Sequence, residues 1–335
     1  MISVVVPVYN EEESLVELHR QLDEVFASGS LGPVEFLFVD DGSRDGSWRV
    51  VSELARRDPR IRAIRFRRNF GKASALTAGF QAARGDRVFT LDADLQDDPA
   101  EIPRFLAMLD DRGLDVVSGW KKTRHDPWHK VYPSRVFNWM VSALTGCVLH
   151  DHNCGFKVYR GEVLREVGIY GELHRFVPAL AHARGFRVGE MEVHHRPRVH
   201  GSSKYGVARF AKGFLDLLTV VFLTRFRQRP LHVFGGSGLL LSALGFLGLL
   251  YLALVWTAGF WMEHPKPIGG RPLLSYSIAL LVVGVQLFSL GILAELVTAY
   301  GIREADTHSV AETIEPSAPG DAAAGRSAHD PPREP

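Results

Sequence analysis

Two long apolar stretches near the carboxyl end limit most strongly what this chain can fold into. Residues 233–262 and 273–300 contain few charged side chains. At about 1.5 Å per helical residue, each is long enough to cross a hydrocarbon core of about 30 Å. Buried helices of water-soluble proteins rarely stay apolar for that length. The sequence therefore predicts two transmembrane helices that anchor the 335-residue chain in a membrane.

The charges beside these stretches predict an orientation. Three arginines lie just before the first stretch and Arg303 lies just after the second, whereas the loop between them carries Lys266 and Arg271 against Glu263. Because basic flanks are enriched on the cytoplasmic side, both spans are expected to have their outer ends there. No cleavable leader precedes the first apolar strand, so the part before the spans is also expected in the cytoplasm.

The rest of the composition narrows the class of protein. The net charge is +1, and no nucleic-acid partner is predicted. Cys147 and Cys154 are the only cysteines, and their spacing matches no common zinc pattern. They are expected to be small buried hydrophobes in a reducing compartment. Residues 303–335, which are rich in Ala, Pro, Gly, Ser and charge, are expected to be a disordered cytoplasmic tail.

The first two thirds of the chain alternate short apolar runs with helical segments. This pattern is typical of an α/β domain with a mainly parallel sheet. In such a sheet, ligands bind at the carboxyl ends of the strands, so the residues that follow each apolar run are the candidates for a binding site. The expected strands are residues 2–9, 34–39, 61–66, 88–91 and 114–120.

Three oxygen-bearing side chains, Asp92, Asp94 and Gln96, follow the apolar run at 88–91. The two-residue period of a strand would project them to the same side. Hard divalent cations prefer such oxygen ligands, and two carboxylates beside an apolar strand are costly unless a positive charge joins them. We therefore predict that they bind Mg²⁺ or Mn²⁺. The alternative is that this acidic segment only caps the following helix, and capping is enough to explain Asp98.

Polar residues follow the other predicted strands as well. Asn10 is expected to cap a helix whose first turn is residues 11–13. Asp41 could accept hydrogen bonds from a ribose or a base, whereas Asp45 is assigned to capping. Lys72 follows the third strand at a glycine-containing turn, which suits an anionic ligand, and a solvated surface charge is an equal alternative.

Four short motifs resemble the successive motifs of family 2 glycosyltransferases: Val-Pro-Val-Tyr-Asn-Glu at 6–11, Val-Asp-Asp-Gly-Ser at 39–43, Asn-Phe-Gly-Lys at 69–72 and Asp-Ala-Asp-Leu-Gln at 92–96. The resemblance extends from residue 2 to about residue 300. Within the family, the chain looks like the polyprenyl-phosphate glycosyltransferases, such as dolichyl-phosphate mannose synthases and bacterial undecaprenyl-phosphate glucosyltransferases. This resemblance implies a GT-A-like nucleotide-sugar fold.

The predicted organisation has four parts: a cytoplasmic glycosyltransferase domain at 1–204, an amphipathic juxtamembrane helix at 205–230, a two-helix transmembrane anchor at 231–302 and the tail at 303–335. Basic and aromatic residues at 121–135 precede an amphipathic helix at 136–145. With two spans downstream, we expect this element at the membrane surface. A charged loop beside an ordinary core helix is the alternative.

The resemblance also implies roles for individual residues. The residues that would contact the nucleotide sugar are Pro7, Tyr9, Glu11, Asp41, Lys72 and Asp92. The catalytic residues would be Asp94, Asp151 and Lys204, with Asp151 orienting the acceptor or the sugar, or serving as a base. Bringing two anionic substrates together requires positive charge, and the residues predicted for the acceptor phosphate are Arg124, Arg135 and Arg198.

The predicted reaction is the inverting transfer of one sugar from a UDP- or GDP-linked donor to a polyprenyl phosphate at the cytoplasmic membrane face, by a monomer or a homo-oligomer. The product would serve cell-envelope or protein glycosylation. One alternative is a processive polysaccharide synthase, although the sequence lacks the Gln-x-x-Arg-Trp motif and further spans typical of those enzymes. The other is a catalytically silent membrane scaffold that binds a nucleotide sugar, which would need few of these residues.

Overall fold

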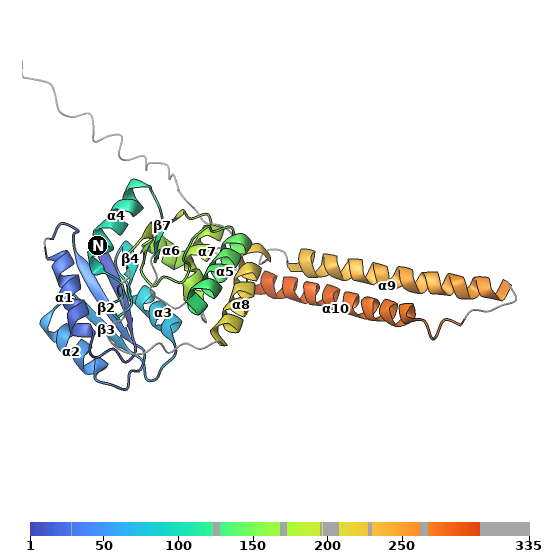
Figure 1. Ribbon diagram of the computed structural model, residues 1–335, viewed down its shortest axis with the longest axis horizontal. Helices are drawn as coiled ribbons and strands as arrows, with labels where there is room; N and C mark the ends of the chain where they lie inside the picture. The colour runs from blue at the N-terminus through green and yellow to red at the C-terminus, as the bar shows by residue number, and fades with distance from the viewer. Residues whose placement is uncertain are drawn as a thin grey trace, which may run out of the picture.

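The computed structural model describes residues 1–27, 29–122, 128–167, 173–194, 196, 208–226, 230–261 and 267–301 (Figure 1). A seven-stranded sheet in the order β3-β2-β1-β4-β6-β5-β7 lies at its centre. The strands are β1 (Ile2–Val8), β2 (Val34–Asp40), β3 (Ile61–Arg65), β4 (Arg87–Thr90), β5 (Val116–Trp120), β6 (Lys157–Arg160) and β7 (Val188–Glu192). Only β6 runs antiparallel to its neighbours. The predicted α/β class with a mainly parallel sheet is confirmed.

Alternate residues of the central strands enter two separate cores. Val4 and Val6 of β1 pack on one face against α1 (Leu15–Phe26), α2 (Ser47–Arg57) and α4 (Ile102–Asp111). Val5 packs on the other face, which α3 (Lys72–Ala82), α6 (Gly161–Glu166) and α7 (Val177–Ala183) cover. Burying one such side chain contributes about 1.5–3 kcal/mol, which explains why these strands are apolar on both faces. Cys147 and Cys154 are buried free thiols, as predicted.

A second group of helices lies beside the sheet at the end nearest the apolar hairpin (Figure 1). Helix α5 (Trp128–Thr145) packs against α8 (Ala208–Val221) and the short η2 (Leu173–Phe176) through an apolar cluster that includes Val141, Phe176 and Leu217. Helix α8 continues into a π-helical turn, η3 (Phe222–Phe226). Large apolar side chains remain exposed on both helices, namely Val136, Trp139, Phe214, Leu215 and Leu218.

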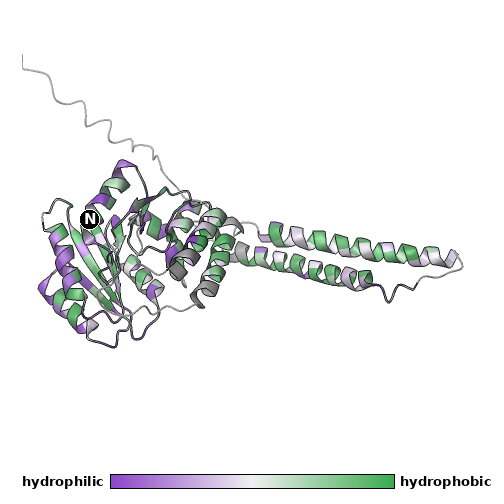
Figure 2. Cartoon of the chain, viewed as in Figure 1, coloured by the Kyte–Doolittle hydropathy of each residue, from purple (hydrophilic) through white to green (hydrophobic). Residues whose placement is uncertain are grey.

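The two predicted apolar stretches form α9 (Pro230–Trp261) and α10 (Pro272–Gly301), which project together away from the sheet (Figure 1). Figure 2 shows apolar residues along most of both helices. Their segments Pro230–Gly259 and Pro272–Val297 are long and apolar enough to cross a membrane. The prediction of two helices suited to a membrane is confirmed, whereas the four part boundaries stay a prediction.

Small residues line the contact between α9 and α10. A Cβ atom added to Gly284 would lie 2.5 Å from the backbone nitrogen of Ser242, and one added to Gly245 would lie 2.6 Å from the backbone nitrogen of Leu281. In lipid, where apolar side chains gain little by leaving the solvent, helices associate through such close backbone packing. The hairpin therefore has its own internal packing.

The first helix begins later than the sequence predicts. Helix α1 starts at Leu15, and Asn10 adopts the left-handed conformation with φ 55°. The Oδ1 atom of Asn10 accepts from the backbone N–H of Arg44 at 2.8 Å, and its own N–H donates to the Ser43 hydroxyl at 3.0 Å. The prediction that Asn10 caps a helix is wrong because its side chain binds the loop after β2 instead.

Candidate active site

The loops that follow β1 and β2 are bound to each other at the carboxyl edge of the sheet. The N–H of Glu11 donates to the Ser47 hydroxyl at 2.8 Å, and the N–H of Glu12 donates to Asp45 at 3.3 Å. Asp45 also accepts from the N–H of Ser47, the first residue of α2, which is the contact of an Asx turn, whereas Gly46 is the cap residue of the helix. This network places the predicted donor-binding residues Pro7, Tyr9 and Glu11 on and just beyond β1.

Asp41 holds the loop before α3. Its buried carboxylate accepts from Asn69 Nδ2 at 2.9 Å, from the N–H of Phe70 at 2.7 Å and from the N–H of Gly71 at 2.9 Å. Burial raises the pKa of Asp41 above its ordinary value. These contacts set the position of Lys72, the next residue, and the predicted contact between Asp41 and a nucleoside stays a prediction.

Asp92 lies beyond the end of its strand and is ion-paired. Strand β4 ends at Thr90, and a turn with Leu95 at φ 62° follows, so the expectation that a strand period aligns Asp92, Asp94 and Gln96 is wrong. Lys72 donates to Asp92 Oδ1, and therefore Lys72 is not merely a solvated surface charge. Burial alone would raise the pKa of Asp92, but Lys72 and Lys121 lower it below its ordinary value.

A second ion pair lies next to the first. Lys121 at the end of β5 is 2.9 Å from Asp97, whose side chain is buried. Although burial would lower the pKa of Lys121, Asp97 and Asp92 raise it above its ordinary value. The sequence motifs did not single out Lys121, because nothing local indicates that its partner is a carboxylate 24 positions earlier.

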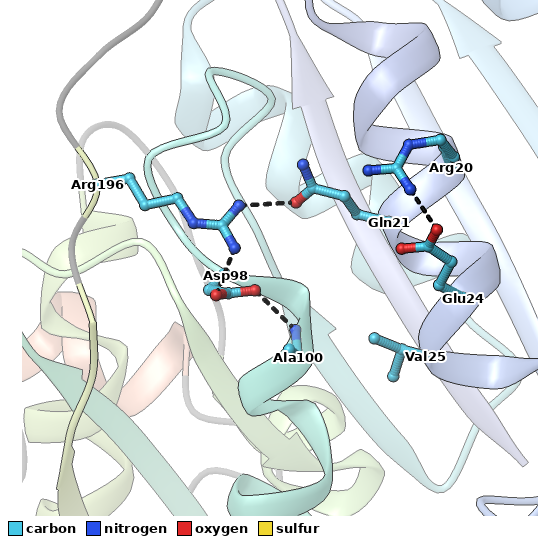
Figure 3. Close-up of a pocket in the computed structure, with 7 residues that line it drawn as sticks. All are labelled: Arg20, Gln21, Glu24, Val25, Asp98, Ala100 and Arg196. Carbon is cyan, nitrogen blue, oxygen red and sulfur yellow. Dashed lines mark hydrogen bonds and ion pairs between the residues drawn. The ribbon is translucent and has the colours of Figure 1, made fainter.

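The turn that carries Asp94 and Gln96 is braced from outside the sheet. The N–H of Gln96 donates to Asp94 Oδ1 at 3.2 Å, and the N–H of Arg196 donates to the Gln96 carbonyl at 3.0 Å. The guanidinium of Arg196 binds Asp98 and Gln21 (Figure 3). Asp98 also accepts from the N–H of Ala100 in η1 (Pro99–Glu101), which confirms its predicted capping role.

The cavity beside this brace has a volume of about 460 Å³ and lies between α1 and η1 (Figure 3). Arg196 pairs there with Asp98, and Arg20 pairs with Glu24. Because the cations and carboxylates of its lining neutralise one another, we assign this cavity a structural role. Arg196 was not predicted, since its partners Gln21 and Asp98 are 175 and 98 positions away.

The donor set at this edge fits a divalent cation. Among the residues that the structure describes, no three His, Cys, Asp or Glu side chains gather as a metal centre. Mg²⁺, however, commonly uses only one or two carboxylates and takes its other ligands from water and substrate phosphates. An ammonium group, that of Lys72, already occupies the position of a cation on Asp92. The backbone of Gly155 lies close to the same carboxylate, because a Cβ added to Gly155 would lie 2.7 Å from it.

Asp151 lies in the loop that enters β6. Because β6 is antiparallel to β4, its amino end meets the carboxyl end of β4, and Thr90 donates to the Gly155 carbonyl at 2.7 Å. Asp151 is buried, and its Oδ1 accepts from the N–H of Asn153 at 3.0 Å. The structure thus brings the Asp151 loop next to the Asp92 turn, through Gly155.

The predicted phosphate-binding residues are placed only in part. Arg135 is exposed on α5, four residues from the exposed Trp139 and therefore on the same helix face. Arg124, Arg198 and Lys204 lie outside the described residues. Their predicted roles stay predictions.

Comparison with known proteins decides the family. Residues 3–168 match the model described as glycosyl transferase family 2. A dodecaprenyl-phosphate galacturonate synthase of Rhizobium johnstonii is 40% identical over 300 residues, which cover 88% of this chain and 87% of that protein. The chain belongs to glycosyl transferase family 2. It is a glycosyltransferase, as the four motifs predicted.

A second curated relative and one solved structure are similar to parts of this glycosyltransferase. An undecaprenyl-phosphate 4-deoxy-4-formamido-L-arabinose transferase of Pseudomonas paraeruginosa is 37% identical over 297 residues, which cover 88% of this chain and 84% of that protein. Among solved structures, a glucosyl-3-phosphoglycerate synthase from Mycobacterium tuberculosis, in complex with Mn²⁺ and uridine-diphosphate-glucose, matches with a TM-score of 0.49 and 18% identity over 66% of this chain and 78% of that one.

Proposed function

We propose that this glycosyltransferase moves one sugar from a nucleotide sugar to a polyprenyl phosphate at a membrane surface. The observation that carries the proposal is the combination, in one chain, of an ion-paired acidic edge on an α/β sheet with an apolar helical hairpin. The names of two relatives that each match 88% of this chain describe polyprenyl-phosphate sugar transferases, which supports the same acceptor.

The protein needs to do little to activate the nucleophile, but it must stabilise the leaving group. A phosphate monoester with a second pKa of about 6 is largely dianionic at neutral pH, so the lipid phosphate can attack the anomeric carbon without a strong base. Asp92, Asp94 and Gln96 would hold Mg²⁺ or Mn²⁺, which supplies a Lewis acid for the leaving diphosphate. Lys72 and Lys121 add positive charge at the same place, and Asp151 would orient the acceptor. Inversion at the anomeric carbon is expected from a single displacement.

The membrane contact would extend beyond α9 and α10. Trp139 of α5 and Leu215 of α8 are 69% and 62% exposed, which is unusual for side chains of this size unless something apolar covers them. We propose that the α5–α8 face lies on the membrane surface next to the hairpin. The acceptor phosphate, at the head of its lipid, would then reach the acidic edge from this side.

The orientation of the hairpin is tested by reporter fusions. Arginines flank the outer ends of both spans, and such ends stay in the cytoplasm. A reporter fused after Arg303 is expected to be active in the cytoplasm, and one inserted at Pro267 is expected on the opposite side. If both report the cytoplasm, the pair of helices does not cross the membrane.

Replacement of Arg135 tests the route of the acceptor. Arg135→Ala is expected to raise the KM for polyprenyl phosphate by about 10-fold or more, since a charge-assisted hydrogen bond contributes about 1.5–3 kcal/mol. Donor binding without acceptor should stay normal. Arg112→Ala, which removes an exposed arginine at the end of α4, is the matched control. Loss of donor affinity in Arg135→Ala would assign this residue to the donor site instead.

One assay tests the proposed reaction itself. Membranes containing the protein are incubated with polyprenyl phosphate and labelled UDP- or GDP-sugars, and label is measured in the organic extract. We expect extractable label with at least one donor. A long water-soluble polymer would indicate a processive synthase, and donor binding without any product would indicate a silent scaffold.

A further inference from the structure

Two side chains of opposite charge, the buried Lys157 and the largely buried Glu190, hold the Asp151 loop from the sheet. Glu190 of β7 accepts at Oε1 from the N–H of Asp151, at 2.8 Å, and at Oε2 from the N–H of His150, at 3.0 Å. Lys157 of β6 donates to the carbonyls of His152, at 3.3 Å, and Cys154. The anion therefore binds the amides and the cation binds the carbonyls of one loop.

The sheet places these two charges on one face. Ser118 of β5 is level with Glu190 on one side and with Lys157 on the other. Residues that are level across neighbouring strands project to the same face. Rigid strands thus carry both groups, and their positions relative to the loop are set by the sheet register.

Further contacts fix the ring and the carbonyl group of His150, the first residue of the loop. The ring of His150 stacks on Trp120, with ring centroids 4.3 Å apart and an interplanar angle of 17°, and its Nδ1 lies 2.8 Å from Glu190 Oε2. Asn138 of α5 donates to the His150 carbonyl at 2.8 Å. Glu190 is the one carboxylate among the described contacts that binds both His150 and Asp151.

We propose that Glu190 is a positioning residue for sugar transfer, which acts by fixing the backbone that aims Asp151 at the acceptor. The inference rests on the proposed function. Without Glu190, the N–H of the buried Asp151 and the N–H of the more exposed His150 both lose their acceptor. For the amide of Asp151, a buried donor left without a partner is costly. The loop would relieve that cost by moving, and Asp151 would move with it.

The test compares Glu190→Ala and Glu190→Gln with Glu192→Ala. Glu192 lies two residues further along the same strand, but it is exposed and pairs with Lys122 at the surface, so its removal should leave transfer unchanged. Glu190→Ala is expected to lower kcat by about 10- to 100-fold, with the donor KM unchanged. Glu190→Gln should recover part of this loss, because its amide oxygen can still accept from the N–H of Asp151.

A double-mutant cycle separates positioning from general stability. If Glu190 acts through Asp151, adding Glu190→Ala to Asp151→Asn should lower kcat by less than about 2-fold beyond the single variant. An undiminished loss in that background, or a weaker affinity for the donor alone, would overturn the inference.

Amide hydrogen exchange gives a readout that does not depend on turnover. Exchange in the peptide spanning residues 150–154 should be faster in Glu190→Ala than in the wild type or Glu192→Ala. Unchanged exchange would overturn the inference. A wild-type protein that transfers no sugar would contradict the proposed function, and the exchange result would still decide whether Glu190 holds this loop.

Discussion

Replacing Asp94 by Asn is expected to lower sugar transfer by about 1000-fold or more, which corresponds to ~4 kcal/mol, because the leaving diphosphate would lose its metal-held counter-charge. The fold should survive. Asp94 accepts from the N–H of Gln96 at 3.2 Å, and the amide oxygen of Asn can accept the same hydrogen bond. The variant therefore removes a charge and keeps the shape of the turn.

Transfer to polyprenyl phosphate and the thermal midpoint of unfolding are the two measurements. Asp111→Asn, which removes an exposed carboxylate at the end of α4, is the control for the loss of one negative charge. The wild type should also lose activity in excess chelator and recover it with Mg²⁺ or Mn²⁺. Normal turnover in Asp94→Asn, or full activity in chelator, would overturn the metal assignment.

Replacing Lys72 by Met is expected to strengthen metal binding and to slow sugar transfer. Lys72 neutralises Asp92 and so competes with a divalent cation for that carboxylate. Without a donor, Mn²⁺ should bind Lys72→Met about 10-fold more tightly, because the competing ammonium is gone. Transfer should nevertheless fall by about 10- to 100-fold, since one cation proposed to act on the diphosphate is lost.

Calorimetric titration with Mn²⁺ in the absence of nucleotide measures the first effect, and the transfer assay measures the second. Lys122→Met is the matched control, because Lys122 pairs with Glu192 on the surface and should change neither quantity. Weaker Mn²⁺ binding in Lys72→Met would mean that Lys72 supports the carboxylate geometry instead of competing with the cation.

Features that depend on local composition could be predicted without the structure. Helices α9 and α10 correspond to the two apolar stretches, since an unbroken apolar segment longer than 25 residues has few alternatives to a membrane helix. The strands β1 and β2 likewise correspond to apolar runs that are buried on both faces. The four motifs were sufficient for the family, because each is a short local pattern of residues and needs no knowledge of tertiary contacts.

Predictions from the sequence were wrong where they depended on the tertiary contacts or the local turns of polar residues. Asn10 has the composition of a helix cap, yet it binds Arg44 from the next loop. Asp92, Asp94 and Gln96 were expected to follow a strand period, but β4 ends at Thr90 because the chain turns there. Local sequence contains no information about which of two competing hydrogen bonds the folded chain will make.

The sequence alone determined the family through four short motifs. The α/β class, the apolar hairpin and the acidic strand ends followed from short-range periodicity and composition. Only the tertiary structure decided which charges meet: Lys72 with Asp92, Lys121 with Asp97, and Glu190 with the amides of the Asp151 loop. Those pairs join strands and loops that the sheet order β1-β4-β6-β5-β7 brings side by side. A contact between residues dozens of positions apart depends on the register of the whole sheet, which no single segment encodes.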